Sequence, residues 1–86
     1  MNTSMGNITR EVAISVASAD FTDEFGFFIR SGGGGDIKYC PLGNLLDSEA
    51  ITKTVDASAL FVDPVICRKI FHTGTSATSI YVGYGV

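Results

Sequence analysis

Few side chains in this sequence have the types and spacing that catalysis requires. Cys67 and His72 are the one pair that could serve as a thiol and an imidazole base. In a strand, a separation of five residues places two side chains on opposite faces. No third group is spaced to orient the imidazole. We therefore expect a packed thiol and a structural or interfacial histidine, and we predict no catalytic residues and no enzymatic activity.

The glycine run Gly32 to Gly35 raises the possibility of a phosphate-binding loop. Such a loop needs a lysine and a helix N-terminus beside the phosphates. Here Asp36 follows the glycines, strand-forming residues come next, and the carboxylate would repel an anion. We expect a hairpin loop instead, with no bound cofactor.

Metal binding also lacks a suitable ligand set. Cys40 and Cys67 are too few and too far apart in sequence for a zinc site. They could meet across strands, but free thiols are the default in a reducing cytosol. Asp20, Asp23 and Glu24 lack the alternating oxygen ligands of a calcium loop. We expect a solvated acidic turn there and no metal site.

Charge and length exclude two classes of partner. The chain has 86 residues and a net charge of −3, and 17% of its residues are charged, against about 25% in an average soluble protein. The six basic residues form no stripe that would neutralise phosphates: Arg10, Arg30, Lys38, Lys53, Arg68 and Lys69. No apolar run approaches the roughly 20 residues of a membrane span. We predict neither a nucleic-acid nor a membrane partner.

The segment Ala17-Ser18-Ala19 resembles a signal-peptide cleavage site. The apolar run before it, residues 12–16, is too short for a signal peptide and begins beside Glu11. We therefore expect a protein that is not secreted.

Short β-rich runs separated by turn residues predict strands at 11–17, 25–30, 36–40, 51–55, 59–62, 65–72 and 79–86. Two antiparallel hairpins are expected, one joining 25–30 to 36–40 and one joining 65–72 to 79–86. Residues 19–24 are expected to connect strands, and 42–49 to form a loop or one helical turn. Alternation places Phe25, Phe27 and Ile29 on one face of their strand, and Val12, Ile14 and Val16 on one face of theirs.

These elements predict one all-β domain over residues 1–86, a small antiparallel β-sandwich or barrel of about six to seven short strands. In a chain this short, burial of apolar surface barely offsets the entropy of ordering, so disulfides, metals or partners must add stability. No charged residue follows Lys69. We expect this charge-free end to pack against a neighbouring copy of the same chain.

The nine aromatic residues allow a second interpretation, a stacking platform for sugars. Core and subunit contacts explain them at least as well. They are Phe21, Phe25, Phe27, Phe28, Phe61, Phe71, Tyr39, Tyr81 and Tyr84.

Three motifs carry a family resemblance: Gly35-Asp36-Ile37 after the glycine run, Arg68-Lys69-Ile70, and the segment from Thr73 to Ile80, TGTSATSI. Over about residues 27–84 the chain resembles the small head-spike-base-like virion structural proteins of tailed phages and gene transfer agents. It departs from that family at Ser76, where threonine is frequent, and in the length of the Gly32 to Gly35 run.

The resemblance implies a non-enzymatic virion protein, assembled in the host cytoplasm, that forms an oligomeric base on a capsid vertex and mounts a spike, fibre or decoration. Its implied partners are copies of itself in a ring, the major capsid protein, and a spike or fibre protein. It also implies that the segment from Thr73 to Thr78 forms a hairpin turn, and that Gly35 and Asp36 begin a strand. The alternatives are a head-decoration, neck or tail-tip component, or a carbohydrate- or receptor-binding module.

Within these motifs the hydroxyls of Thr73, Thr75, Ser76 and Thr78 are expected to bond neighbouring backbone groups. Arg68 and Lys69, adjacent in a strand, are expected to reach opposite faces, and one of them to pair with an acidic neighbour.

Overall fold

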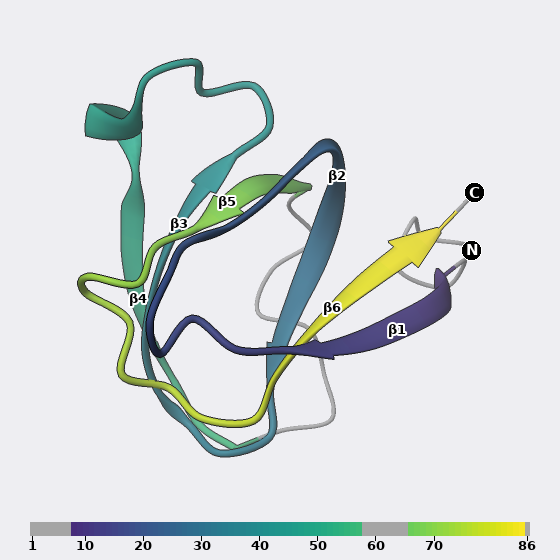
Figure 1. Ribbon diagram of the computed structural model, residues 1–86, viewed down its shortest axis with the longest axis vertical. Helices are drawn as coiled ribbons and strands as arrows, with labels where there is room; N and C mark the ends of the chain where they lie inside the picture. The colour runs from purple at the N-terminus through teal and green to yellow at the C-terminus, as the bar shows by residue number, and fades with distance from the viewer. Residues whose placement is uncertain (1–7, 58–65, 86) are drawn as a thin grey trace.

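The computed structural model describes residues 8–57 and 66–85, which form an all-β fold of six strands and one 3-10 turn (Figure 1). The strands are β1 (Ile8–Ile14), β2 (Phe21–Ser31), β3 (Gly35–Pro41), β4 (Ile51–Val55), β5 (Cys67–Ile70) and β6 (Ile80–Gly85), and the turn is η2 (Asp47–Glu49). The prediction of a small all-β protein with short strands is confirmed. The strand predicted at 59–62 lies outside the described residues.

All paired strands are antiparallel, in the order β1-β6-β2-β5-β3-β4. The long strand β2 belongs to both halves of this sheet. Its first part, up to Phe27, pairs with β5, and its last part, from Phe28 to Ser31, pairs with β6. The sheet therefore turns at β2, and its two halves face each other across a common core, as a small sandwich or barrel requires.

Neither predicted hairpin exists. Strand β5 lies between β2 and β3, and β2 lies between β5 and β6, so the strands expected to pair are separated by a third. The loop after β2 binds elsewhere, because the N–H groups of Gly32 and Gly33 donate to the carbonyls of Ser79 and Thr78 at 2.8 and 3.0 Å. Turn signals in the sequence indicated where strands end, but not which strands are neighbours.

Two strand boundaries also differ from the prediction. β1 begins at Ile8 and ends at Ile14, where its ladder with β6 ends at the pair Ile14 and Ile80. Val16 lies beyond the strand yet is buried in the core. β2 begins at Phe21, so part of the predicted acidic connector is strand, paired with β5 through Phe21 and Thr22.

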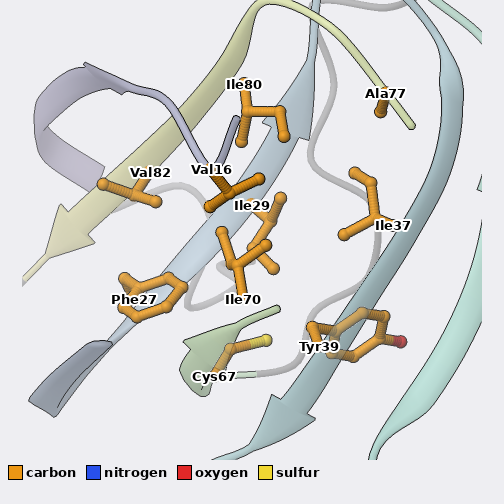
Figure 2. Close-up of a cluster of buried hydrophobic side chains, with 10 residues drawn as sticks. All are labelled: Val16, Phe27, Ile29, Ile37, Tyr39, Cys67, Ile70, Ala77, Ile80 and Val82. Atoms are coloured by element: carbon orange, nitrogen blue, oxygen red, sulfur yellow. The ribbon is translucent and has the colours of Figure 1, made fainter. Parts of the chain in front are cut away.

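The core gathers buried side chains from both halves of the sheet (Figure 2). Ile37 of β3, Ile70 of β5 and Val82 of β6 are fully buried. The cluster consists of Val16, Phe27, Ile29, Ile37, Tyr39, Cys67, Ile70, Ala77, Ile80 and Val82. The branched side chains of β2, β3, β5 and β6 therefore supply most of the hydrophobic stabilisation.

The two cysteines occupy different environments. Cys67 belongs to the core cluster. Cys40 is buried outside that cluster, and its thiol donates to the carbonyls of Asn44 and Leu46 in the loop after β3, at 3.4 and 3.7 Å. Neither cysteine forms a disulfide in this structure.

Arg68 forms a β-bulge in β5. Lys69 pairs with Cys40 and Cys67 pairs with Pro41, so Arg68 has no partner in β3. A bulge places consecutive side chains on one side of the strand. The prediction that Arg68 and Lys69 reach opposite faces is therefore wrong, because both contact the same carboxylate, that of Asp47.

The segment from Phe71 to Ser79, which connects β5 to β6, closes the fold along the first half of β3. The Phe71 N–H donates to the Lys38 carbonyl at 2.9 Å, and the N–H groups of Ser76 and Ala77 donate to the Asp36 carbonyl at 2.8 and 3.0 Å. This connector thus occupies the position of a strand beside β3.

Two hydroxyls of the connector replace backbone acceptors in this pairing. Thr75 Oγ1 accepts the N–H of Lys38 and Ser76 Oγ accepts the N–H of Asp36, each at 3.0 Å. These hydroxyls were expected to bond neighbouring backbone groups within a hairpin turn. They bond instead to a strand 37 and 40 residues away, because the segment crosses from β5 to β6 along β3.

Gly35 is required where the connector meets β3. Its φ is +123°, and a Cβ there would lie 2.8 Å from the N and Cα of Ala77. We predict that Gly35→Ala lowers the free energy of unfolding by about 1–3 kcal/mol, through backbone strain and this overlap. Urea unfolding followed by far-UV circular dichroism measures the loss, since the chain has no tryptophan.

Gly43→Ala is the matched control, because a Cβ at Gly43 meets nothing within 4 Å. Equal losses in both variants would show that the close approach of Gly35 to Ala77 contributes nothing.

Candidate functional site

A groove of about 370 Å³ lies between the end of β1 and the connector. It falls in the lower part of the range found for small-molecule sites, about 300–1,000 Å³. Ile14, Val16, Ala77 and Ile80 give it an apolar floor. The remaining lining residues are Ser15, Ala17, His72, Thr75, Ser76, Thr78 and Ser79.

Three of the hydroxyl groups that line this groove are hydrogen-bonded within the protein. The oxygens of Ser15, Thr75 and Ser76 accept the main-chain N–H groups of Ala17 (3.2 Å), Lys38 (3.0 Å) and Asp36 (3.0 Å). No carboxylate, amine or thiol lines the groove. Its walls can donate and accept hydrogen bonds, but they provide no nucleophile and base in contact.

His72 ties this region to the end of β1. Its Nδ1 lies 2.7 Å from the Val16 carbonyl, and its main-chain N–H donates to Asp20 Oδ1 at 2.7 Å. Since a carbonyl only accepts, Nδ1 carries the proton in the neutral ring. Cys67 lies in the core whereas His72 is exposed after β5. The structure places His72 in a structural contact, in agreement with its expected role.

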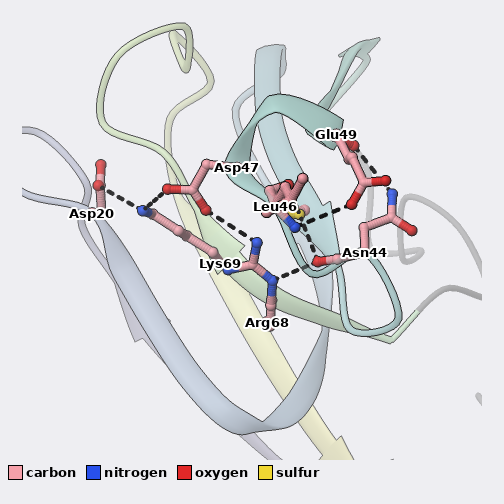
Figure 3. Close-up of polar contacts among 8 residues, drawn as sticks. Asp20, Asn44, Leu46, Asp47, Glu49, Arg68 and Lys69 are labelled. Carbon is pink, nitrogen blue, oxygen red and sulfur yellow. Dashed lines mark hydrogen bonds and ion pairs between the residues drawn. The ribbon is translucent and has the colours of Figure 1, made fainter.

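The most connected polar cluster lies where η2 covers β5 (Figure 3). The Asp47 carboxylate accepts from Arg68 Nη2 at 3.0 Å and from Lys69 Nζ at 2.8 Å. Arg68 Nε donates to the Asn44 carbonyl at 2.8 Å, and Lys69 also lies 3.5 Å from Asp20. These contacts hold the loop after β3 against β5.

Hydrogen bonds from Lys69 and Arg68 lower the pKa of Asp47 below its ordinary value of 3.8. The hydrogen bond that Lys69 donates to Asp47 raises the pKa of Lys69 in turn. Within the loop, Glu49 Oε1 accepts the Leu46 N–H at 3.1 Å, and Asn44 Nδ2 donates to the Glu49 carbonyl at 3.1 Å. These bonds join Asn44, Asp47, Glu49, Arg68 and Lys69 into one network, which we call the clasp.

A second polar layer covers the outer face of β1, β6 and β2. Arg30 binds Glu11 through two hydrogen bonds, of 2.6 and 2.8 Å, and its guanidinium lies 4.0 Å from the centre of the Tyr81 ring. The hydrogen bond from Arg30 lowers the pKa of Glu11. This bidentate pair joins the first strand to the second across β6.

Tyr84 makes a third link. Its hydroxyl donates to Asp23 Oδ2 at 2.8 Å, and the guanidinium of Arg10 lies 4.3 Å from its ring centre. Burial and then this hydrogen bond raise the pKa of Tyr84. Asp20 and Asp23, which were expected to lie in a solvated acidic turn, therefore both make contacts with other parts of the fold.

The aromatic side chains do not gather into an exposed platform. Tyr39 is only 2% exposed. Tyr81 and Tyr84 are covered by Arg30 and Arg10, and Phe71 lies under Lys38 and Lys69, at 5.1 and 4.7 Å. Phe27 and Phe28 are buried, and Phe61 lies outside the described residues.

Phe25 is the exception, with 84% of its surface exposed. Between the pairs Thr22–Lys69 and Phe27–Cys67, β2 has four residues and β5 has only Arg68. This irregularity breaks the alternation, so the prediction that Phe25 shares the core face of Phe27 and Ile29 is wrong. Exposing the ring forgoes roughly 1.5–3 kcal/mol of burial. Gly26, isolated within the predicted strand, was the signal in the sequence for such a bulge.

Other apolar side chains are exposed near Phe25. A Cβ at Gly26 would touch the side chains of Ile66 and Leu42, and both of these residues are exposed. Leu45 and Leu46 are exposed in the loop that follows. The pairings of Cys67 with Phe27 and with Pro41 place the middle of β2, the end of β3 and the start of β5 at the same end of the molecule (Figure 1). This apolar end was not predicted from the sequence.

Among residues 8–57 and 66–85 there is no group of three or more His, Cys, Asp or Glu side chains that could hold a metal ion. No helix in this described part is long and apolar enough to cross a membrane.

Comparisons with known proteins return no match: no family, no curated protein and no solved structure resembles this chain at a significant level. The geometry described above is therefore the basis on which its function must be argued.

We predict that Asp47→Asn lowers the thermal unfolding midpoint at neutral pH, because the clasp loses its anion. A carboxyl whose pKa is lowered on folding contributes stability above its unfolded pKa, and this contribution is lost as the pH falls through the folded pKa. The difference between wild type and variant should therefore shrink progressively below pH 3.8. Thermal melts followed by circular dichroism over this range measure it.

Ser48→Ala, in the same turn, is the control and should melt like the wild type at every pH. A constant difference between Asp47→Asn and wild type down to about pH 2 would contradict an ionic clasp.

Proposed function

We propose that this protein is a non-enzymatic structural component of a phage virion, an oligomeric, ring-like base on the capsid vertex that mounts a spike, fibre or decoration. Its work is to bind copies of itself, the major capsid protein, and the spike or fibre. The observation that carries the proposal is the exposed apolar end formed by Phe25, Leu42 and Ile66 in a chain so poor in charge.

The use of charge in this fold supports an assembly role. Arg30 pairs with Glu11, and Arg68 and Lys69 pair with Asp47. These ion pairs bind strands and loops of one copy together. With only 17% of its residues charged, the chain has little charge to repel a second copy, and exposed apolar patches rimmed by polar residues are typical of protein interaction sites.

The edges of the sheet support it further. Within the part of the chain that the structure describes, β1 pairs only with β6, and β4 pairs only with β3. Each outer edge therefore presents main-chain N–H and C=O groups that another strand can bind. Two such edges on one module suit contacts that repeat around a ring.

The motifs that carry the family resemblance have a structural explanation. Gly35 and Asp36 meet Ser76 and Ala77 where the connector closes against β3. Because these residues fix the fold, we expect virion proteins of the same architecture to keep the same residue types at these positions, even where they mount different spikes or fibres.

The carbohydrate- or receptor-binding alternative depends on exposed rings. Tyr39 is in the core and Tyr81 lies under Arg30. Among the described Phe and Tyr residues, only Phe25 is classed as exposed to solvent. Head-decoration, neck and tail-tip positions use the same kind of assembly and differ from the proposed base in location.

Two measurements test the proposal. We predict that the purified protein sediments as a concentration-dependent oligomer at micromolar concentrations in analytical ultracentrifugation, because self-association buries the apolar end. A stable monomer across the whole concentration range would contradict the assembly role.

The second measurement is the position of the protein in the particle. Cryo-electron microscopy of virions should locate its density at capsid vertices, beneath a projecting protein. Density at the neck or the tail tip would replace the vertex assignment with one of the other virion positions.

A further inference from the structure

The backbone around Phe25 holds its ring in solvent. Gly26 has φ +90°, in the left-handed region, and a Cβ there would lie too close to the side chain of Ile66. Asp23 Oδ1 accepts the Phe25 N–H at 2.9 Å. Bulges often re-aim a side chain at a functional position. Here the bulge turns an aromatic ring away from the core that receives Phe27 two residues later.

A groove of about 170 Å³ lies directly beside this ring. Glycines form much of its wall, at Gly26, Gly83 and Gly85, so no Cβ blocks the approach of another chain. The other lining residues are Phe25, Phe27, Phe28, Ile66 and Tyr84. An apolar cavity of about 150 Å³ is enough to bind benzene, so this groove has room for one phenyl ring.

Charges of opposite sign flank the ring and the groove. Glu24, exposed, is the neighbour of Phe25 in the chain. The Arg10 guanidinium lies 4.3 Å from the centre of the Tyr84 ring, which lines the groove. Within residues 8–57 and 66–85, neither Glu24 nor Arg10 makes an ion pair. An acidic residue thus precedes the protruding ring in the chain, and a basic side chain lies by the recess.

We propose that the Phe25 ring and the groove beside it, together called the Phe25 patch, form a two-fold contact between two copies of the chain. In this contact the Phe25 ring of each copy enters the groove of the other. Glu24 of each copy then meets Arg10 of the other. Because the ring and the groove lie side by side on one surface, the contact is self-complementary, as an isologous interface requires.

This inference rests on the proposed function in assuming that copies associate, and it assigns the contact to defined residues. A pairwise contact at the Phe25 patch leaves the outer edges of β1 and β4 free for contacts around a ring. A second copy fits the patch better than an unrelated partner, since the ring itself lines the recess, and Arg10 beside the recess can attract the Glu24 that precedes the ring of the other copy.

Phe25→Ser tests the contact. The side chain is exposed, so the variant should keep the circular dichroism spectrum and melting temperature of the wild type. We expect sedimentation equilibrium to show a dissociation constant for the pair raised at least about thirtyfold, the effect of removing an aromatic hot spot. If the wild type forms a larger ring-based assembly, the variant should have half its mass.

Leu45→Ser is the matched control. Leu45 is 83% exposed, close to the 84% of Phe25. It lies in the loop after β3, however, and does not line the groove. This variant should associate like the wild type, with a dissociation constant within about threefold. A loss as large as that of Phe25→Ser would transfer the contact to the loop and overturn the proposal.

A charge exchange tests the pairing of the two copies. Glu24→Arg alone and Arg10→Glu alone should each weaken the pair about tenfold, and the double variant should restore it, since attraction returns with reversed signs. If the wild type associates but Phe25→Ser and the charge variants associate equally well, the Phe25 contact is refuted while the assembly function stands. A wild type that stays monomeric refutes both.

Discussion

The fold depends on the main-chain pairing between the connector, residues 71–79, and the first half of β3. Strands β5 and β6 do not bind each other, so no hairpin holds the C-terminal part of the chain in place. Instead the Asp36 carbonyl accepts two connector N–H groups, and the Thr75 and Ser76 hydroxyls accept the N–H groups of β3. This contact aligns β3 with the loop after β2 and closes the sheet around Ile37, Ile70 and Val82.

Closing the fold in this way commits polar groups to hydrogen bonds and ion pairs within the molecule rather than to contacts with its surroundings. Thr75 and Ser76 satisfy backbone donors of β3, and His72 binds the end of β1 through Val16. The ion pairs of Asp47 and Glu11 likewise join segments of one chain. Large apolar side chains are left on the surface, and Phe25 is the most exposed of those in residues 8–57 and 66–85. The proposed association would therefore have the same origin as these folding contacts, a sequence with few charges.

Strand positions could be predicted from the sequence because alternation and turn residues are local signals. The patterns at 36–40 and 51–55 correspond closely to β3 and β4. Strand neighbours could not be predicted, since the insertion of β5 between β2 and β3 depends on contacts between distant residues. The bulge at Arg68 was missed for the same reason, because its extra residue is visible only once the partner strand is known. Of the bulge before Phe27, Gly26 was the one local signal, and it does not show how many residues are unpaired. Consequently the clasp at Asp47 and the exposure of Phe25 were both beyond the reach of periodicity.

The two buried thiols can report on separate motions of this molecule. Cys40 is covered by the loop after β3, whose carbonyls at Asn44 and Leu46 accept from it, whereas Cys67 is enclosed by the core. Opening of the loop alone would expose Cys40 to an alkylating reagent, while Cys67 would react only when the sheet itself separates. A native protein with this arrangement carries its own pair of kinetic probes, one for a local fluctuation and one for global unfolding, without any engineered label.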